Sequence, residues 1–147
     1  MVNLNQTING LGTVRRRNSS GAVHAAFVET LSIVRVLNSF ENPAHGSLST
    51  HVINPIVGAP VTRIGIGTGM RHGTIRSNTY TFQYLIGLID SSIYSRNGDS
   101  GAPVFCSISH HAVGMHMAGL NGIQGGEVRS ISVRVSLINE MFGLTRY

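Results

Sequence analysis

Short apolar segments, each ended by glycine or a polar turn, are the feature of this 147-residue chain that most constrains its fold. Their length and their β-branched residues predict strands rather than helices. The 18 glycines fit this pattern, since glycine adopts the positive φ angles that tight turns require. The strand-like segments cover residues 23–28, 31–37, 54–69, 73–76, 79–88, 103–107, 112–118 and 131–135.

Turns and one helix complete the predicted secondary structure. We expect a chain reversal at 70–72 and a hairpin that turns at 109–111. Along 131–135 the apolar residues alternate with Ser132 and Arg134, which predicts one buried and one exposed face. Only the tail has helical spacing: Ser136 is the expected N-cap, Leu137, Ile138, Met141 and Phe142 share a face, and Gly143 ends the helix. This pattern indicates an all-β barrel or sandwich with a C-terminal helix.

Composition narrows the class of protein. With 41% hydrophobic residues and a mean hydropathy of +0.13, the chain is expected to fold as one globular unit. No apolar run reaches the roughly 18 residues of a membrane span, so no membrane partner is expected. The first 13 residues lack the pattern of a signal peptide, so the chain is expected to stay in the cytosol or to have lost its front end, and its compartment is left open. The single cysteine, Cys106, excludes an intramolecular disulfide.

The charge is a formal net +5, carried by 11 arginines and no lysine. The one basic cluster is Arg15-Arg16-Arg17, which could contact nucleic acid or acidic lipid. The cluster is short, has no interleaved aromatic residues and precedes a Ser/Gly-rich turn. We therefore expect a solvated loop and no nucleic-acid partner.

The segment Asn97-Gly98-Asp99-Ser100-Gly101-Ala102-Pro103 carries the chemistry. A serine between glycines, followed by proline and a strand, predicts a tight loop that presents a hydroxyl. The amides of Gly98 and Ser100 can then converge as an oxyanion hole, in which each donor contributes roughly 10²–10³ in rate. A purely structural β-turn uses the same residue types, so the motif alone is a moderate signal.

This motif resembles the Gly-Asp-Ser-Gly-Gly-Pro signature of the chymotrypsin-like serine proteases, with Ala102 at the second glycine. The segments 57–65, 68–75 and 112–119 also resemble that family in order, and most closely its α-lytic protease and streptogrisin branch. The family is usually secreted. The resemblance spans about residues 12–147 and implies a complete C-terminal antiparallel β-barrel with a terminal helix over 57–147. Residues 1–56 are then the remnant of an incomplete N-terminal barrel and the connection between the barrels, and the front of the catalytic domain is expected to be missing.

The resemblance also implies roles for individual residues. Ser100 becomes the catalytic nucleophile, and Asp99 becomes the buried partner of Arg63, although Arg63 could also be a surface strand residue. The segment 116–119 becomes the substrate-binding strand, made of His116, Met117, Ala118 and Gly119. His116 would lie at the base of the first specificity pocket, where an imidazolium could pair with an acidic side chain. The alternative is a plain histidine of the pocket wall.

The rest of a catalytic triad is not identifiable. His24, in His24-Ala25-Ala26-Phe27-Val28, stands where the family has the aspartate that orients the catalytic histidine. No segment matches the strand that carries the base, and neither Asp90 nor Glu29 fits a triad pattern. The other histidines lie in predicted loops, where one could swing toward Ser100. The histidines show no zinc-ligand spacing, and neither a metal nor another cofactor is expected.

Two functions therefore stay open. One is a serine endopeptidase, present as a fragment or an incomplete catalytic domain, that acts on peptide or protein substrates through an acyl-enzyme on Ser100. The other is an inactive pseudoprotease that binds peptides or proteins. Whether the chain is an enzyme is thus undecided. Because a shortened first barrel would expose the apolar residues over 23–37, we also expect self-association.

Overall fold

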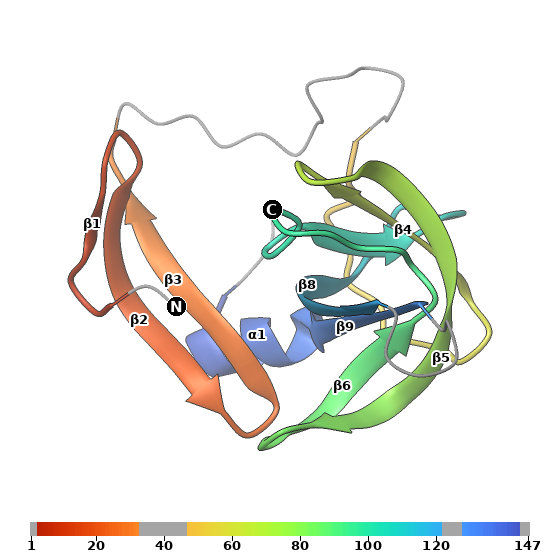
Figure 1. The fold of residues 1–147 in the computed structure, drawn as a ribbon. Coiled ribbons are helices and arrows are strands. Elements are labelled where there is room, and N and C mark those ends of the chain that lie inside the picture. Colours follow the sequence, from red (N-terminus) through yellow and green to blue (C-terminus); the bar gives the residue numbers. More distant parts are fainter. Residues whose placement is uncertain (1–2, 33–46, 122–127, 145–147) are drawn as a thin grey trace.

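The computed structural model describes residues 3–32, 47–121 and 128–144. Within them the chain forms a small antiparallel sheet, a closed six-stranded antiparallel barrel and one C-terminal helix (Figure 1). This confirms the predicted all-β class and its barrel. The helix of this part of the chain is not long and apolar enough to cross a membrane.

The first sheet contains β1 (Thr7–Ile8), β2 (Gly12–Ser20) and β3 (Val23–Thr30), in that order. The expected solvated loop at Arg15–Arg17 is wrong, because these residues lie within β2. Arg15 Nε donates to Glu29 Oε2 of β3 over 2.6 Å, and the Arg16 guanidinium lies 4.9 Å from the centre of the Phe27 ring. The basic cluster thus contacts its own sheet.

The barrel closes where its first strand along the chain pairs with the last strand in the spatial order. Its strands in spatial order are β4 (Pro60–Gly65), β5 (Gly69–Phe82), β6 (Leu85–Ser91), β9 (Val128–Arg134), β8 (Ala112–Asn121) and β7 (Pro103–Cys106). β4 pairs with β7 through Val61 and Cys106, which leaves no open edge at that point. Buried Ile75, Ile89 and Val104 fill the interior.

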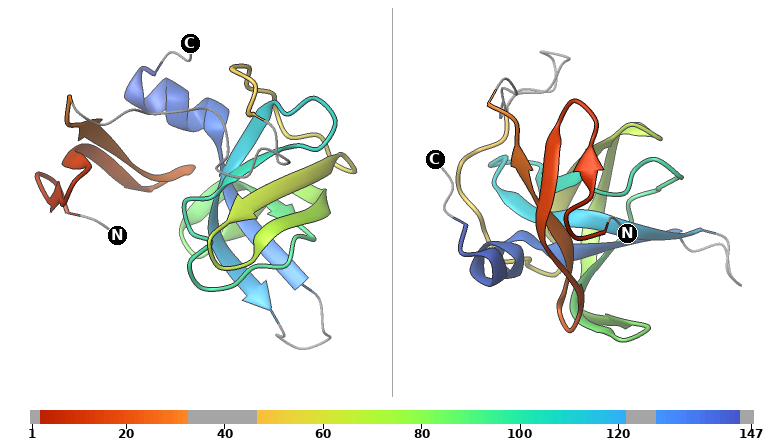
Figure 2. Two further views of the ribbon diagram at one scale, coloured as in Figure 1. Left: turned by 90° about the horizontal axis from the view of Figure 1, so that it is seen from above. Right: turned by 90° about the vertical axis from the view of Figure 1, so that its left-hand side faces the viewer.

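The sheet and the barrel share a second core. Val23 and Ala25 of β3 pack with Leu88 and Ile131 of the barrel and with Phe142 of α1 (Val135–Phe142). Figure 2 shows α1 alongside β3 and the barrel. Val23 and Ala25 are thus covered, against our expectation of an exposed face, while residues 33–37 lie outside the described residues. Self-association and the division at residue 56 stay predictions.

Several local expectations need correction. The reversal lies at 66–68, because Gly65 pairs with Gly69, and residues 70–72 are inside β5. The burial of β9 does not alternate, since Ser130 and Ser132 are as buried as Ile131. In α1 the N-cap is Arg134 rather than Ser136, and Met141 is 48% exposed. Gly143 ends the helix with φ 61°, as predicted.

Candidate functional site

The loop around Ser100 is shaped by two glycines. Gly98 and Gly101 have φ angles of 98° and 87°, which favour glycine. The Asp99 amide donates to Arg96 O, the Ala102 amide to Asp99 O, and the Gly101 amide to His116 O of β8. Within the described residues the amides of Gly98 and Ser100 donate to no protein group. The Ser100 side chain is exposed, so the loop presents both a hydroxyl and two unused donors.

Asp99 holds this loop from below. Its carboxylate is fully buried and accepts five hydrogen bonds: from Arg63 Nη2 at 2.8 Å, from the amides of Gly67, Thr68 and Arg96, and from Thr68 Oγ1. Burial alone would raise the pKa of Asp99. The hydrogen bonds from Arg96 and Thr68 and the charge of Arg63 outweigh it, so the pKa lies below its usual value.

Arg63 lies inside the barrel wall, fully buried, and is therefore no surface residue. Its Nη2 also donates to Tyr94 O and Thr68 Oγ1, whereas its Nε and Nη1 have no partner in the described part of the chain. Burial lowers the pKa of Arg63 and Asp99 raises it. The structure thus brings the two sequence-predicted residues together as a buried ion pair.

The sequence analysis missed the residues that make room for this pair. A Cβ on Gly65 would stand 2.2 Å from Asp99 Oδ1, and one on Gly67 would stand 2.4 Å from Asn97 O. Thr68 donates to Asp99 through both its amide and its hydroxyl. The closely spaced glycines of Gly65-Ile66-Gly67-Thr68-Gly69 could have indicated this tight turn beside Asp99. We overlooked them because we expected the chain to turn at 70–72.

A cavity of about 300 Å³ opens beside Ser100. Ser95, Arg96 and Asn97 line one side, and the predicted substrate-strand residues, 116–119, line the other. Ser100 Oγ donates to Met117 O over 3.3 Å, its one hydrogen bond within the described residues. The four residues predicted from 116 to 119 and the hydroxyl of Ser100 therefore share one cavity.

His116 forms the buried end of that cavity. It is 3% exposed, and its Nδ1 lies 2.9 Å from Ser130 Oγ of β9. The sequence analysis missed this partner because Ser130 precedes the strand predicted at 131–135. Burial and then the charge of Arg63 lower the pKa of His116 to about 4, against a smaller opposing effect of Asp99. The ring is therefore neutral at pH 7, which favours the plain pocket-wall histidine over the imidazolium, the two alternatives that the sequence left open.

His24 lies across a second cavity from Ser100. This cavity, of about 410 Å³, is lined by His24, Ala25 and Ala26 of β3, by Ser100 and Gly101, and by residues 115–117 of β8. Burial lowers the pKa of His24. No carboxylate lines this cavity or the one beside 116–119. In the described residues, no three His, Cys, Asp or Glu side chains cluster as metal ligands.

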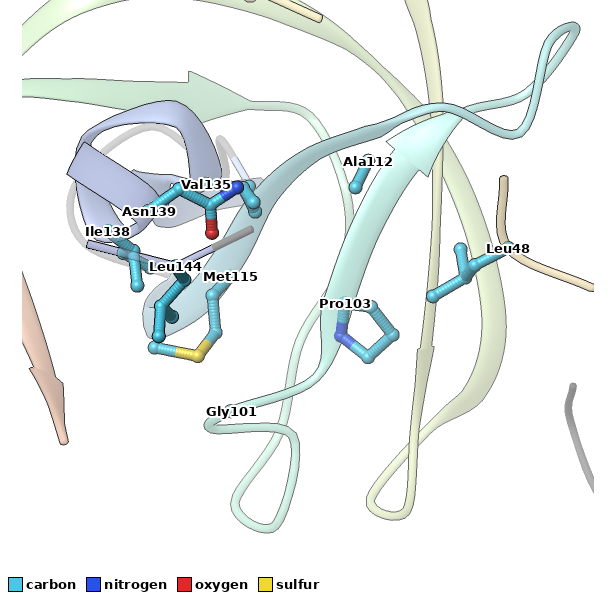
Figure 3. A pocket seen from close by; sticks show the side chains of 10 residues that line it. Leu48, Gly101, Pro103, Ala112, Met115, Val135, Ile138, Asn139 and Leu144 are labelled. Atoms are coloured by element: carbon cyan, nitrogen blue, oxygen red, sulfur yellow. The ribbon is translucent and has the colours of Figure 1, made fainter. Parts of the chain in front are cut away.

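A third cavity, of about 370 Å³, lies between α1 and the β7–β8 pair (Figure 3). Pro103, Met115, Ile138 and Leu144 point into it and make it apolar. Gly101 and Met115 line both this cavity and the one that contains His24. The loop around Ser100 thus borders an apolar cavity through Gly101.

Similarity to known proteins was found among solved structures and not among sequences. No protein-family profile matches the chain, and no curated protein sequence does. Among solved structures, Cellulomonas bogoriensis chymotrypsin is 26% identical with a TM-score of 0.79, over 95% of this chain and 76% of that one. Thermobifida fusca protease A is 25% identical with a TM-score of 0.75, over 92% and 73%.

A third structure is described as a glutamic-acid-specific serine protease that uses a histidine triad in substrate binding. It is 20% identical with a TM-score of 0.78, over 93% of this chain and 74% of that one. Because all three structures superpose on more than nine-tenths of this chain with TM-scores of 0.75 to 0.79, the chain has the fold of the bacterial chymotrypsin-like serine proteases.

Proposed function

We propose that this chain is a serine-type endopeptidase whose nucleophile is Ser100. The observation that carries the proposal is the exposed hydroxyl on a loop with two unused amide donors, anchored by the buried Asp99–Arg63 pair. A buried, multiply bonded anchor keeps such a loop rigid before substrate arrives, as electrostatic stabilisation of a transition state requires. The similarity to structures of bacterial serine proteases supports the same chemistry.

In the proposed reaction, Ser100 Oγ attacks the carbonyl carbon of a peptide bond. The amides of Gly98 and Ser100 donate to the oxyanion of the tetrahedral intermediate. Its collapse expels the amine and leaves an ester on Ser100, which water then hydrolyses. Each step needs a group that moves a proton to or from Ser100, and no such group is hydrogen-bonded to this hydroxyl among the described residues.

The edge of β8 is the proposed binding site of the peptide backbone. β7 pairs with β8 only as far as Met115, and from Ala118 onward β8 is paired with β9 on its other side. Within the described residues, the edge at 118–120 therefore offers backbone groups that pair with no other strand on that side, and an extended peptide can add there as a further strand. Ser100 lies at the start of that edge, next to Met117.

We further propose that the cavity at 116–119 takes an acidic side chain. Neutral His116, with Nδ1 bonded to Ser130, can donate from Nε2 to a carboxylate. One similar structure is described as glutamic-acid-specific.

The alternative is an inactive protein that binds peptides along β8. Two observations favour it: Ser100 bonds only to a carbonyl in the described residues, and a histidine stands where the family has its orienting aspartate. Under this alternative the chain binds an extended peptide and releases it intact.

Peptide cleavage separates the two functions. The purified chain and a Ser100→Ala variant are incubated with a set of peptides that differ only in having Glu, Gln or Leu before the scissile bond. We expect cleavage after Glu by the chain and none by the variant, with binding of the Glu peptide retained by both. Binding without cleavage by the chain would reject the endopeptidase in favour of the alternative.

A further inference from the structure

The cavity between β3 and the nucleophile loop contains a second functional group besides Ser100. His24 reaches this cavity from β3, and Ser100 reaches it from the loop that follows β6. The two residues are 76 positions apart in the sequence, and the packing of β3 on the barrel brings them to the same cavity. The remaining lining is mostly alanine, glycine and methionine.

Only two side chains of this lining can accept a proton at neutral pH, His24 and His116. His116 is unsuited to that role, because its Nδ1 is bonded to Ser130 and the ring is buried beside the cation of Arg63. A second positive charge there would be strongly unfavourable. His24 is half-buried, and its ring makes no hydrogen bond within the described residues. Among the described residues that line this cavity, His24 is therefore the one available base.

We propose that His24 is the general base for Ser100 and acts across this cavity through one water molecule. The proposal rests on the proposed endopeptidase function. A cavity of about 410 Å³ is wide enough for water, which needs polar partners such as the Ser100 hydroxyl and a ring nitrogen of His24. Proton transfer through a single water is within the range of general-base catalysis.

The proton balance of the step is simple. As the bond forms between Ser100 Oγ and the carbonyl carbon, the hydroxyl proton passes to the water. A proton of that water passes to the neutral ring of His24 in the same step. The imidazolium of His24 then returns this proton by the same route to the departing amine, so the histidine is neutral again at the acyl-enzyme.

The test measures how fast a fluorophosphonate probe labels Ser100 in the full chain and in its variants. We expect His24→Ala to label about a hundredfold more slowly, at the lower end of what a general base contributes. His24→Gln retains size and polarity but accepts no proton at neutral pH, so it should be equally slow. Added imidazole should restore part of the rate in His24→Ala and none in Ser100→Ala. His51→Ala, which changes an exposed histidine bonded to Ser49, is the matched control and should label at the rate of the unchanged chain.

The outcomes distinguish the two proposals. Labelling of His24→Ala or His24→Gln at the rate of the unchanged chain would overturn the role of His24 and leave the endopeptidase in place. A chain that labels no faster than Ser100→Ala would reject the endopeptidase and, with it, the base. Circular dichroism of each variant shows whether it is folded, and if His24→Ala is not, His24→Gln decides.

Discussion

The buried pair of Arg63 and Asp99 makes the sharpest stability prediction. Both side chains are 0% exposed, so removing one leaves an uncompensated charge inside the protein. Such a loss costs about 3–5 kcal/mol. The structure indicates where each variant falls in this range, because the two partners differ in the hydrogen bonds that remain.

Arg63→Met leaves Asp99 with four of its five hydrogen bonds, from Gly67, Thr68 and Arg96. We therefore expect this variant to lose about 3 kcal/mol of unfolding free energy. Asp99→Asn removes the negative charge and replaces one carboxylate oxygen by an NH₂ group, which faces N–H or O–H donors in either orientation of the amide. Arg63 then stays a buried cation with neutral acceptors only, and its Nε and Nη1 are already unpartnered in the described residues. This variant should lose about 5 kcal/mol, at the upper end of the range.

Urea unfolding followed by circular dichroism measures these differences. Arg15→Met is the matched control, since it makes the same substitution in an exposed pair, in which Arg15 lies 2.6 Å from Glu29. Although that contact is shorter, its loss should cost less than about 1 kcal/mol because water screens both charges. The reasoning is refuted if Arg63→Met costs no more than Arg15→Met, or if it costs more than Asp99→Asn.

Three further predictions concern the same loop and cavity. The pKa of His116 falls from 6.5 to about 4 on folding, so the ring takes up a proton in the unfolded chain at a higher pH than in the folded one. The free energy of unfolding should therefore drop by about 3 kcal/mol as the pH falls from 6.5 to 4. A His116→Asn chain whose unfolding free energy, measured in urea, changes with pH to the same extent would contradict this. Gly98→Ala places a Cβ on a residue with φ 98° and 3.2 Å from Ile66 Cγ2, so it should move an oxyanion donor and lower peptide cleavage about 100-fold. Gly87→Ala is the control: it is strained at φ 68° but lies away from the loop, so it should leave cleavage unchanged. Gly65→Ala should destabilise the chain by about 1–3 kcal/mol or more, because its Cβ would stand 2.2 Å from the Asp99 carboxylate; a melting temperature equal to that of the unchanged chain would count against the tight packing described above.

Local sequence determined the elements whose cause is local. Short apolar segments with β-branched residues indicated β3, β7 and β8, and Gly143 indicated the end of α1, because backbone preference and turn chemistry act over a few residues. The Gly-Asp-Ser-Gly motif indicated an exposed serine for the same reason. Errors arose where packing overrides pattern: Ile131 and Val133 on one face of β9 pack in the core shared with β3 and α1, whereas Ser130 and Ser132 on the other face are buried although they alternate with apolar residues.

Only the tertiary structure decided which distant residues meet. Barrel closure brings Arg63 of β4 under Asp99, and the turn at 66–68 completes the hydrogen bonds of that carboxylate. The packing of β3 on the barrel and α1 brings His24 to the cavity of Ser100, and the pairing of β8 with β9 brings Ser130 to His116. Such contacts depend on strand register and on how a whole sheet packs, which no short stretch of sequence encodes. The sequence thus determined the loop that presents Ser100, and the fold determined the surroundings of that loop.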